Sequence, residues 1–386
     1  MTAPLARNAL LLGNFVTGTA VLAPAGMLNE LSAGLDVSLQ AAGWLVTFGA
    51  VVLCFGSPLL AWATTHIDRR TLLTGTLVVI VAGHIASALA PNYAVLLAAR
   101  LVLLAVAALY TPQAASTIAL IATDKERPGA IAYIFIGWSL AVALGLPMVT
   151  FLAAQFGWRA AYGGIVVLAT IATVLNAIGL PRGLKGVPLS ASSWVELARN
   201  RQVILLLLIT VLVISGTFQL FVFLGPLLTM LADAGPRTIG ITFAVSGLIG
   251  LVGNVVTTRI VGRVGAYGMS LVLILTMVAG VSIWAVGTGM LTVMLLGTFL
   301  SSVGFAASNS IQQARLSMAA PALSSASIAL NTSGIYVGQA VGSAIAGMLI
   351  AQNLAVAVGY VAAAITAAAL IAVLFTDSES ATIKSP

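Results

Sequence analysis

Long apolar segments, separated by short polar breaks, run through the whole sequence. A helix that rises 1.5 Å per residue needs about 20 apolar residues to cross roughly 30 Å of hydrocarbon. Of the 386 residues, 60% are hydrophobic and 6% are charged, whereas a soluble domain carries about 25% charged residues. No water-soluble globule needs an apolar core of this size. The sequence therefore predicts an all-α membrane protein.

The spacing of the breaks predicts twelve transmembrane helices. The spans are expected at residues 9–31, 41–63, 72–89, 94–121, 129–153, 161–180, 203–231, 240–258, 267–286, 291–314, 324–350 and 354–375. A polar interval divides them into two sets of six. We predict a six-helix bundle in residues 1–181, a cytoplasmic linker in 182–202, a second six-helix bundle in 203–375 and a disordered cytoplasmic tail in 376–386.

The linker carries a helix-capping pattern. Ser193 and Glu196 have the spacing of a capping box, in which each side chain bonds to a free backbone N–H of the first helical turn. This predicts a short interfacial helix with Trp194 at the membrane surface. A solvated loop is the alternative interpretation.

Lys and Arg are distributed unevenly between alternate sides of the predicted spans. With the N-terminus inside, thirteen of the sixteen lie on the cytoplasmic side, Arg159 and Arg237 lie on the other, and Arg100 lies within a span. The positive-inside rule then places both termini in the cytoplasm of a multi-pass protein of the bacterial inner membrane. This topology also accounts for the net charge of +7 without a nucleic-acid partner. With a single cysteine, Cys54, and no metal motif, we expect no metal and no cofactor.

Short motifs follow one another in a characteristic order. Residues 61–73 (AWATTHIDRRTLL) form a cationic turn that contains Asp68, Arg69 and Arg70, and the turn recurs weakly in the second half with Arg259 and Arg263. Arg100 follows in the fourth span and the triplet 145–147 (GLP) in the fifth. In this order the motifs resemble those of the major facilitator superfamily. The resemblance is closer to the drug:proton antiporter branch, which includes bacterial arabinose- and sugar-efflux-type permeases. The recurrence fits two pseudo-symmetric six-helix bundles.

The resemblance implies a secondary transporter and no enzyme. It would export small neutral or amphipathic compounds, sugars or drugs, in exchange for protons, by rocker-switch movement of a monomer in the lipid bilayer. An importer or uniporter on the same fold is the alternative, and an intramembrane enzyme or a channel is a more distant one. The sequence has no G-x-x-x-x-G-K-[ST] motif, hence no sign of ATP hydrolysis.

Three charged residues are candidates for proton coupling. Arg100 lies within a span, where a charge must face protein or water. Glu30 lies at a similar depth, and the resemblance implies that both spans line a central cavity, so we expect the two to pair. Asp36 is the fallback acid. The alternatives are an arginine held by backbone carbonyls and a solvated carboxylate.

Uncharged polar and aromatic residues within the spans are candidates for the cavity wall. Some should face a ligand where the two halves meet, and others should bond between helices. The candidates are Asn14, Tyr110, Gln113, Trp138, Phe218, Gln219, Asn309, Gln312, Asn331, Tyr336 and Gln339.

Three further features concern the shape and packing of the helices. Gly145 and Pro147 should soften the fifth span and allow a bend. The glycines at 334, 338 and 342 share one helix face and predict close packing against a neighbouring span. In the third span, His84 is expected to be a packed histidine rather than a proton relay.

Overall fold

The computed structural model describes residues 3–64, 66–123, 127–184 and 196–376. These residues form helices and contain no strand. The helices of the first half are α1 (Ala3–Leu22), η1 (Ala23–Gly26), α2 (Leu28–Leu35), α3 (Leu39–Ala63), α4 (Arg69–Ala88), α5 (Tyr93–Ala107), α6 (Tyr110–Ile121), α7 (Arg127–Leu140), η2 (Ala141–Gly145), α8 (Leu146–Phe156) and α9 (Trp158–Gly179). Those of the second half are α11 (Arg201–Val222), α12 (Leu224–Ala232), α13 (Pro236–Val286), α14 (Leu291–Ala319), η3 (Pro321–Leu323), α15 (Ser324–Ala351) and α16 (Ala355–Leu374).

Twelve crossings result from eleven candidate membrane helices in the described part of the chain, because α13 crosses twice. Its 51 residues would measure about 75 Å as a straight helix, more than twice the hydrocarbon thickness. The helix breaks at Gly265, whose φ of 77° is accessible to glycine without steric cost. The predicted fold of twelve helices in two pseudo-symmetric bundles is confirmed. One residue, rather than a loop, separates the eighth and ninth spans.

The first span of each half is broken near one end. α1 is followed by η1 and α2, and α11 is followed directly by α12. Each outer piece ends at an aspartate in the left-handed backbone region, Asp36 (φ 52°) and Asp233 (φ 49°). The repeated geometry reflects the pseudo-symmetry of the halves. The exposed Asp36 thus ends a helix at the surface, which favours its interpretation as a solvated residue.

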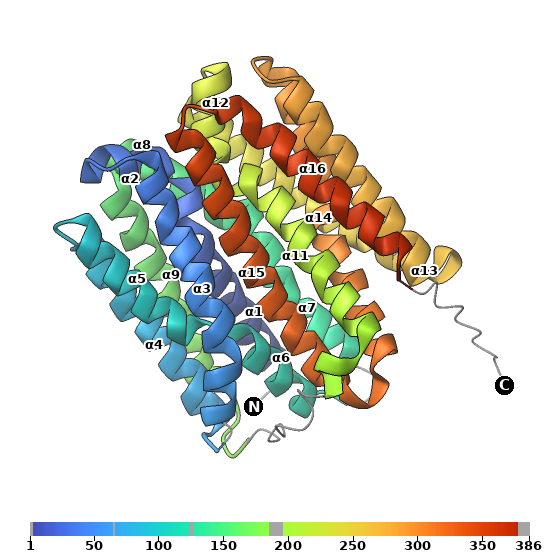
Figure 1. The fold of residues 1–386 in the computed structure, drawn as a ribbon. Coiled ribbons are helices and arrows are strands. Elements are labelled where there is room, and N and C mark those ends of the chain that lie inside the picture. The colour runs from blue at the N-terminus through green and yellow to red at the C-terminus, as the bar shows by residue number, and fades with distance from the viewer. Residues whose placement is uncertain (1–2, 65, 124–126, 185–195, 377–386) are drawn as a thin grey trace.

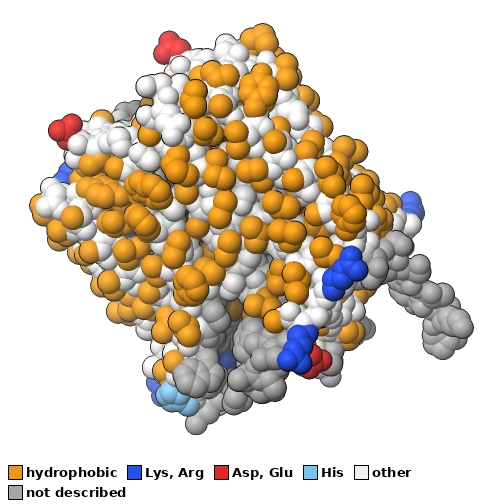
Figure 2. All heavy atoms as spheres, viewed as in Figure 1, with side chains coloured by type: hydrophobic (Ala, Val, Ile, Leu, Met, Phe, Trp, Pro, Cys, Tyr) orange, Lys and Arg blue, Asp and Glu red, His pale blue; other side chains and the backbone are white. Residues whose placement is uncertain are grey.

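The two ends of the bundle differ in what they carry. We call the end at which α1 and α11 begin the linker face, and the end that carries α2 and α12 the opposite face (Figure 1). Hydrophobic side chains cover most of the visible surface between them, and Lys and Arg are confined to its margins (Figure 2). Phe55, Val102 and Leu275 are among the large apolar side chains that are more than half exposed. This surface suits contact with lipid.

Glycines allow the helices to approach closely. A Cβ at position 338 would lie 2.9 Å from the Val211 carbonyl oxygen of α11, and one at 342 would lie 2.5 Å from that of Ser215. The prediction that this glycine stripe packs against a neighbouring span is confirmed. In the fifth span, η2 is a π-helical turn that ends at Gly145, and α8 begins with Pro147 in its first turn. The expected irregularity and the observed one therefore coincide.

The two halves contact each other along two pairs of helices. α3 packs along α15, where the Thr47 hydroxyl donates to Ser343 Oγ (2.9 Å). η2 and α8 pack against α13, and a Cβ at Gly247 would meet the Ala143 backbone nitrogen at 2.4 Å. On the opposite face, α2 and α12 are joined by Asn29 Nδ2, which donates to Thr229 Oγ1 (3.2 Å). The halves are therefore bonded together at this end.

Part of the predicted interfacial helix is visible. Residues 196–199 are helical, and Leu197 among them is buried. Residues 185–195, which include Trp194 and the cap at Ser193, lie outside the described residues, as does the tail beyond Thr376.

Candidate functional site

A hydrogen-bonded network joins three helices of the first half. The Trp138 indole on α7 donates to Thr111 Oγ1 on α6 (3.1 Å), and the Thr111 hydroxyl donates to Asn14 Oδ1 on α1 (2.6 Å). Asn14 Nδ2 in turn donates to the Ile134 carbonyl oxygen (3.0 Å). Asn14 is fully buried, while Thr111 and Trp138 are half-buried. The network fixes the orientation of the Trp138 ring.

A second network occupies the corresponding place in the second half. The Thr210 hydroxyl on α11 donates to Asn331 Oδ1 on α15 (2.7 Å), and Asn331 Nδ2 donates to Asn309 Oδ1 on α14 (2.9 Å). These helices are the first, fifth and fourth spans of the half, as α1, α7 and α6 are in the other. The structure thus brings four predicted residues, Asn14, Trp138, Asn309 and Asn331, into two equivalent clusters of neutral polar groups.

Some predicted cavity residues make hydrogen bonds within or between the helices of one half. The Tyr110 hydroxyl donates to Asn176 Oδ1 (2.9 Å), and the pair links α6 to α9 inside the first bundle. Gln312 Nε2 donates to the Leu206 carbonyl oxygen of α11 (2.6 Å), and Gln219 Nε2 donates to the Ser215 carbonyl oxygen of its own helix (3.2 Å). Each of these side chains makes a hydrogen bond within its own half, while Gln219 Oε1 is buried without a partner among the described residues, and their role as ligand contacts stays a prediction.

Three other candidates keep their polar groups free. Gln113, Tyr336 and Gln339 are buried, yet their side chains make no hydrogen bond with the described residues. On α15, Val337 and Val341 are exposed to the outside. At 100° per residue, Gln339 lies about 160° away from each of them on the helix. It therefore faces the interior of the molecule, where a ligand or water can accept its N–H groups.

Aromatic rings lie beside the second network. Phe218 and Phe221 on α11 lie 5.1 Å apart between ring centroids. Phe221 also stacks on Phe305 of α14, with centroids 6.1 Å apart and planes 8° from parallel. Phe305 and Asn309 are one helical turn apart, and both are half-buried. An apolar ring face and a neutral amide therefore adjoin on α14.

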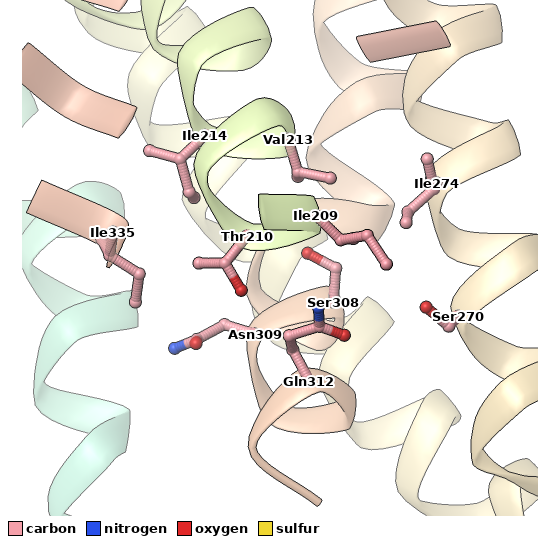
Figure 3. Close-up of a pocket in the computed structure, with 10 residues that line it drawn as sticks. All are labelled: Ile209, Thr210, Val213, Ile214, Ser270, Ile274, Ser308, Asn309, Gln312 and Ile335. Atoms are coloured by element: carbon pink, nitrogen blue, oxygen red, sulfur yellow. The ribbon is translucent and has the colours of Figure 1, made fainter. Parts of the chain in front are cut away.

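A small cavity lies within the second half (Figure 3). Its volume is about 20 Å³, which accommodates one or two water molecules. It is lined by Ile209, Thr210, Val213, Ile214, Ser270, Ile274, Ser308, Asn309, Gln312 and Ile335. A molecule the size of a sugar does not fit in this space.

Arg100 is fully buried and bonds to backbone. Its two terminal nitrogens donate to the carbonyl oxygens of Ala20 (3.4 Å) and Val21 (3.3 Å). These carbonyls lie at the end of α1, where the last turn of a helix leaves its acceptors without an intrahelical partner. Within the described residues, Arg100 has no carboxylate partner. The predicted pairing with Glu30 is thus wrong for this conformation, because similar depth does not place two side chains on facing sides of their helices.

Glu30 lies on α2, beyond the first span, which ends at Gly26. It is half-buried. Burial raises the pKa of its carboxyl group above the ordinary value of 4.5, and a backbone hydrogen bond offsets part of that rise. Its proton is therefore held more tightly than that of a solvated glutamate. His84 is fully buried, with its ring 5.5 Å from that of Tyr162, as expected for a packed histidine.

The cationic turn of the first half is attached to the segment that leaves α9. Asp68 accepts the Gly183 N–H (2.5 Å), and the Arg69 N–H donates to the Leu184 carbonyl oxygen (2.9 Å). Arg70 Nη1 donates to the Leu180 carbonyl oxygen (3.4 Å). In the second half, Arg259 and Arg263 are exposed and make no contact of this kind within the described part of the chain. The recurrence of the motif is therefore not matched by recurrence of its contacts.

Comparisons with known proteins agree with this architecture. The family model described as "Major Facilitator Superfamily" matches residues 10–314. The inner membrane transport protein YdhP of Escherichia coli (strain K12) is 27% identical over 348 residues, covering 90% of this chain and 89% of that protein. A probable sugar efflux transporter of Mannheimia succiniciproducens is 29% identical over 361 residues, covering 92% and 90%.

Another relative is matched over a shorter stretch. The uncharacterized MFS-type transporter YtbD of Bacillus subtilis (strain 168) is 30% identical over 256 residues, which cover 66% of this chain and 65% of that protein. Among solved structures, a D-xylose-proton symporter superposes with a TM-score of 0.79 at 15% identity, over 96% of this chain and 97% of that one. At this identity the likeness establishes the fold alone.

Proposed function

Because the chain belongs to the major facilitator superfamily, we propose that this membrane transporter exports small neutral molecules, with sugars as the first class to test, in exchange for protons. The observation that carries the proposal is the pair of equivalent clusters around Asn14 and Asn309. Each is built from uncharged side chains on the first, fourth and fifth spans of its half. A multiply charged metabolite would need counter-charges that these clusters do not offer.

The names of relatives support the direction of transport. A probable sugar efflux transporter matches almost the whole length of this chain. An importer remains the rival on the same fold, and the direction of gradient-driven flux separates the two. We further propose that one copy of the chain suffices for transport, since both clusters come from a single chain.

Proton coupling is proposed to involve Glu30 and Arg100. Burial raises the pKa of the Glu30 carboxyl, which favours proton uptake near the opposite face. Arg100 is held by two carbonyl oxygens beside the break between α1 and η1. Because these acceptors belong to the end of α1, movement of that helix end would let the Arg100 guanidinium exchange the two carbonyl oxygens for another partner. A conformation in which Arg100 approaches Glu30 would lower the affinity of Glu30 for its proton.

We propose the orientation in the membrane from the distribution of charge. Among the described residues, the start of α1 at Ala3, the end of α16 at Leu374 and the start of α11 at Arg201 lie on one side of a twelve-span bundle, and thirteen of the sixteen Lys and Arg residues are expected on that side. The positive-inside rule favours a cytoplasmic linker face in the bacterial inner membrane. Labelling of a cysteine introduced at Ser190 with a membrane-impermeant maleimide, in a Cys54→Ser background, tests this topology. Labelling in intact cells would contradict it.

Counterflow in proteoliposomes tests the function itself. The purified protein is reconstituted with radiolabelled L-arabinose or D-xylose inside, and a pH gradient is imposed in either direction. Export that stops when the gradient is collapsed supports the proposal. Flux that is independent of the gradient would reject proton coupling, and accumulation in the importing direction would reject export.

A further inference from the structure

In the side-chain amide of Asn309, the oxygen is hydrogen-bonded and the nitrogen is not, among the described residues. Its Oδ1 accepts from Asn331 Nδ2 (2.9 Å) and from Gln313 Nε2 (3.4 Å). An amide oxygen has two lone pairs and can accept both donors at once. The nitrogen, with its two N–H groups, donates to no residue in the described part of the chain.

The asparagine of the first network has both ends of its amide bonded. Asn14 Oδ1 accepts from Thr111, Asn14 Nδ2 donates to the Ile134 carbonyl oxygen, and the side chain is fully buried. Asn309 is half-buried. Unpaired donors in a partly buried site are costly unless water or a ligand accepts them. The two networks thus share a framework, but only the second contains an amide with a free end.

The surroundings of Asn309 indicate the chemistry of its ligand. Thr298, Ser302, Phe305 and Asn309 form a half-buried stripe along one side of α14. Phe305, one turn from Asn309, is stacked on Phe221. An aromatic face beside neutral donors suits a molecule that has a ring with C–H groups on its face and hydroxyl or ether oxygens at its edge. It offers nothing to balance a formal charge.

The ligand reaches Asn309 from the interface between the halves. In Figure 3 the Asn309 amide nitrogen points away from Ser270 and toward the side of Ile335. The cavity on the Ser270 side has room for water only. The free N–H groups therefore face the part of the molecule where a second half can close over a ligand.

We propose that Asn309 is the ligand-contacting donor of the second half, and that its ligand is a neutral polyhydroxylated molecule that packs against Phe305. Asn331 and Thr210 are positioning residues, since they act through the relay Thr210 to Asn331 to Asn309. The inference deepens the proposed function and rests on it for the class of small neutral substrates.

Equilibrium binding to the purified full-length protein in detergent tests the inference without any gradient. Isothermal titration calorimetry is run with L-arabinose, D-xylose and uridine, and with tetraphenylphosphonium as an apolar cation. Asn309→Ala and the near-isosteric Asn309→Asp should both weaken binding of the neutral probe that binds wild type best by at least about tenfold, the loss expected for removing two neutral hydrogen bonds. The exposed Asn8→Ala serves as the matched control.

The positioning role has a separate readout. Asn331→Asp keeps the acceptor for Thr210 but removes the donor to Asn309, so the amide of Asn309 loses its fixed orientation. The ratio of affinities for L-arabinose and D-xylose should move toward one, which a purely structural role would not cause. Melting temperature and gel-filtration profile confirm that each variant is folded.

Two outcomes would overturn the inference. One is wild-type affinity for the neutral probe in both Asn309 variants, and the other is a wild-type protein that binds tetraphenylphosphonium but none of the neutral probes. Binding and transport are measured in separate experiments, so failure of the inference can be distinguished from failure of the proposed function. A protein that binds a pentose through Asn309 but exports none under a pH gradient would reject the proposed export while the assignment of Asn309 stands.

Discussion

Gly247 lies directly against the backbone of the other half, and this contact allows a quantitative prediction. A Cβ added there would lie 2.4 Å from the Ala143 nitrogen, 2.6 Å from its Cα and 2.7 Å from its Cβ. Ordinary van der Waals contact begins near 3.4 Å. The helix α13 would have to move away from η2 by about 1 Å, and the neighbouring atoms belong to backbone that cannot rotate aside.

Gly247→Ala therefore penalises the conformation seen here. Overpacking of this kind costs about 1–3 kcal/mol, which changes the ratio of two conformations by about 5-fold to about 150-fold. A conformation whose halves are separated along α8 and α13 does not incur this cost. The substitution should shift the population toward opening on the opposite face, where Asn29 and Thr229 are now bonded.

Distance measurements between spin labels at Asn29 and Thr229, in a Cys54→Ser background, detect that shift. The Gly247→Ala protein should show a longer mean distance, and its transport rate should change. Gly240→Ala is the matched control, because a Cβ there would meet only Thr150, at 3.9 Å, on the same pair of helices. If both variants give the wild-type distance distribution, the halves do not separate at this contact and the reasoning fails.

Three further predictions concern single side chains. Arg100→Ala should abolish gradient-driven transport in proteoliposomes while the protein still inserts and elutes as a folded species; wild-type rates would remove Arg100 from the mechanism. Tyr110→Phe should lower stability by about 1–3 kcal/mol, because Asn176 Oδ1 is left buried without a donor, with transport retained; an unchanged melting temperature would contradict this. Burial raises the pKa of Glu30, so wild-type stability should fall as pH rises through that raised pKa. Glu30→Gln, which cannot ionise, should lose this fall when melting temperatures are compared from pH 5 to 8, and parallel profiles would refute it.

Much of the fold could be predicted because the bilayer imposes it. Span length, the glycine stripe on α15 and the irregularity at Gly145 each follow from a local rule that acts within a few residues. The joining of two spans into α13 could not be foreseen, since a single glycine at 265 replaces the expected loop. Boundaries of this kind depend on one backbone conformation rather than on composition.

The candidate site was only partly predictable. Amides within spans pointed to Asn14, Asn309 and Asn331, because an amide in hydrocarbon needs partners. Thr111 and Thr210 gave no such signal, since a helical threonine commonly bonds the carbonyl four residues back. For Arg100 the sequence offered both Glu30 and backbone carbonyls as partners, and it could not decide between them. Depth can be counted along a sequence, but the direction in which a side chain points around its helix depends on how the helices are rotated in the packed bundle.

The two halves share a framework but differ in what they leave open, and this difference suggests a division of labour. In the first half the amide of Asn14 is closed, Arg100 is bound at a helix end, and the cationic turn is attached behind α9. In the second half the Asn309 amide is open and the turn is exposed. The proposed exchange of substrate for protons requires a group that contacts the substrate and a group that responds to protons, and these can lie in different halves. The open amide of Asn309 favours a binding role for the second half, and the bonds of Arg100 at a helix end favour a proton response in the first.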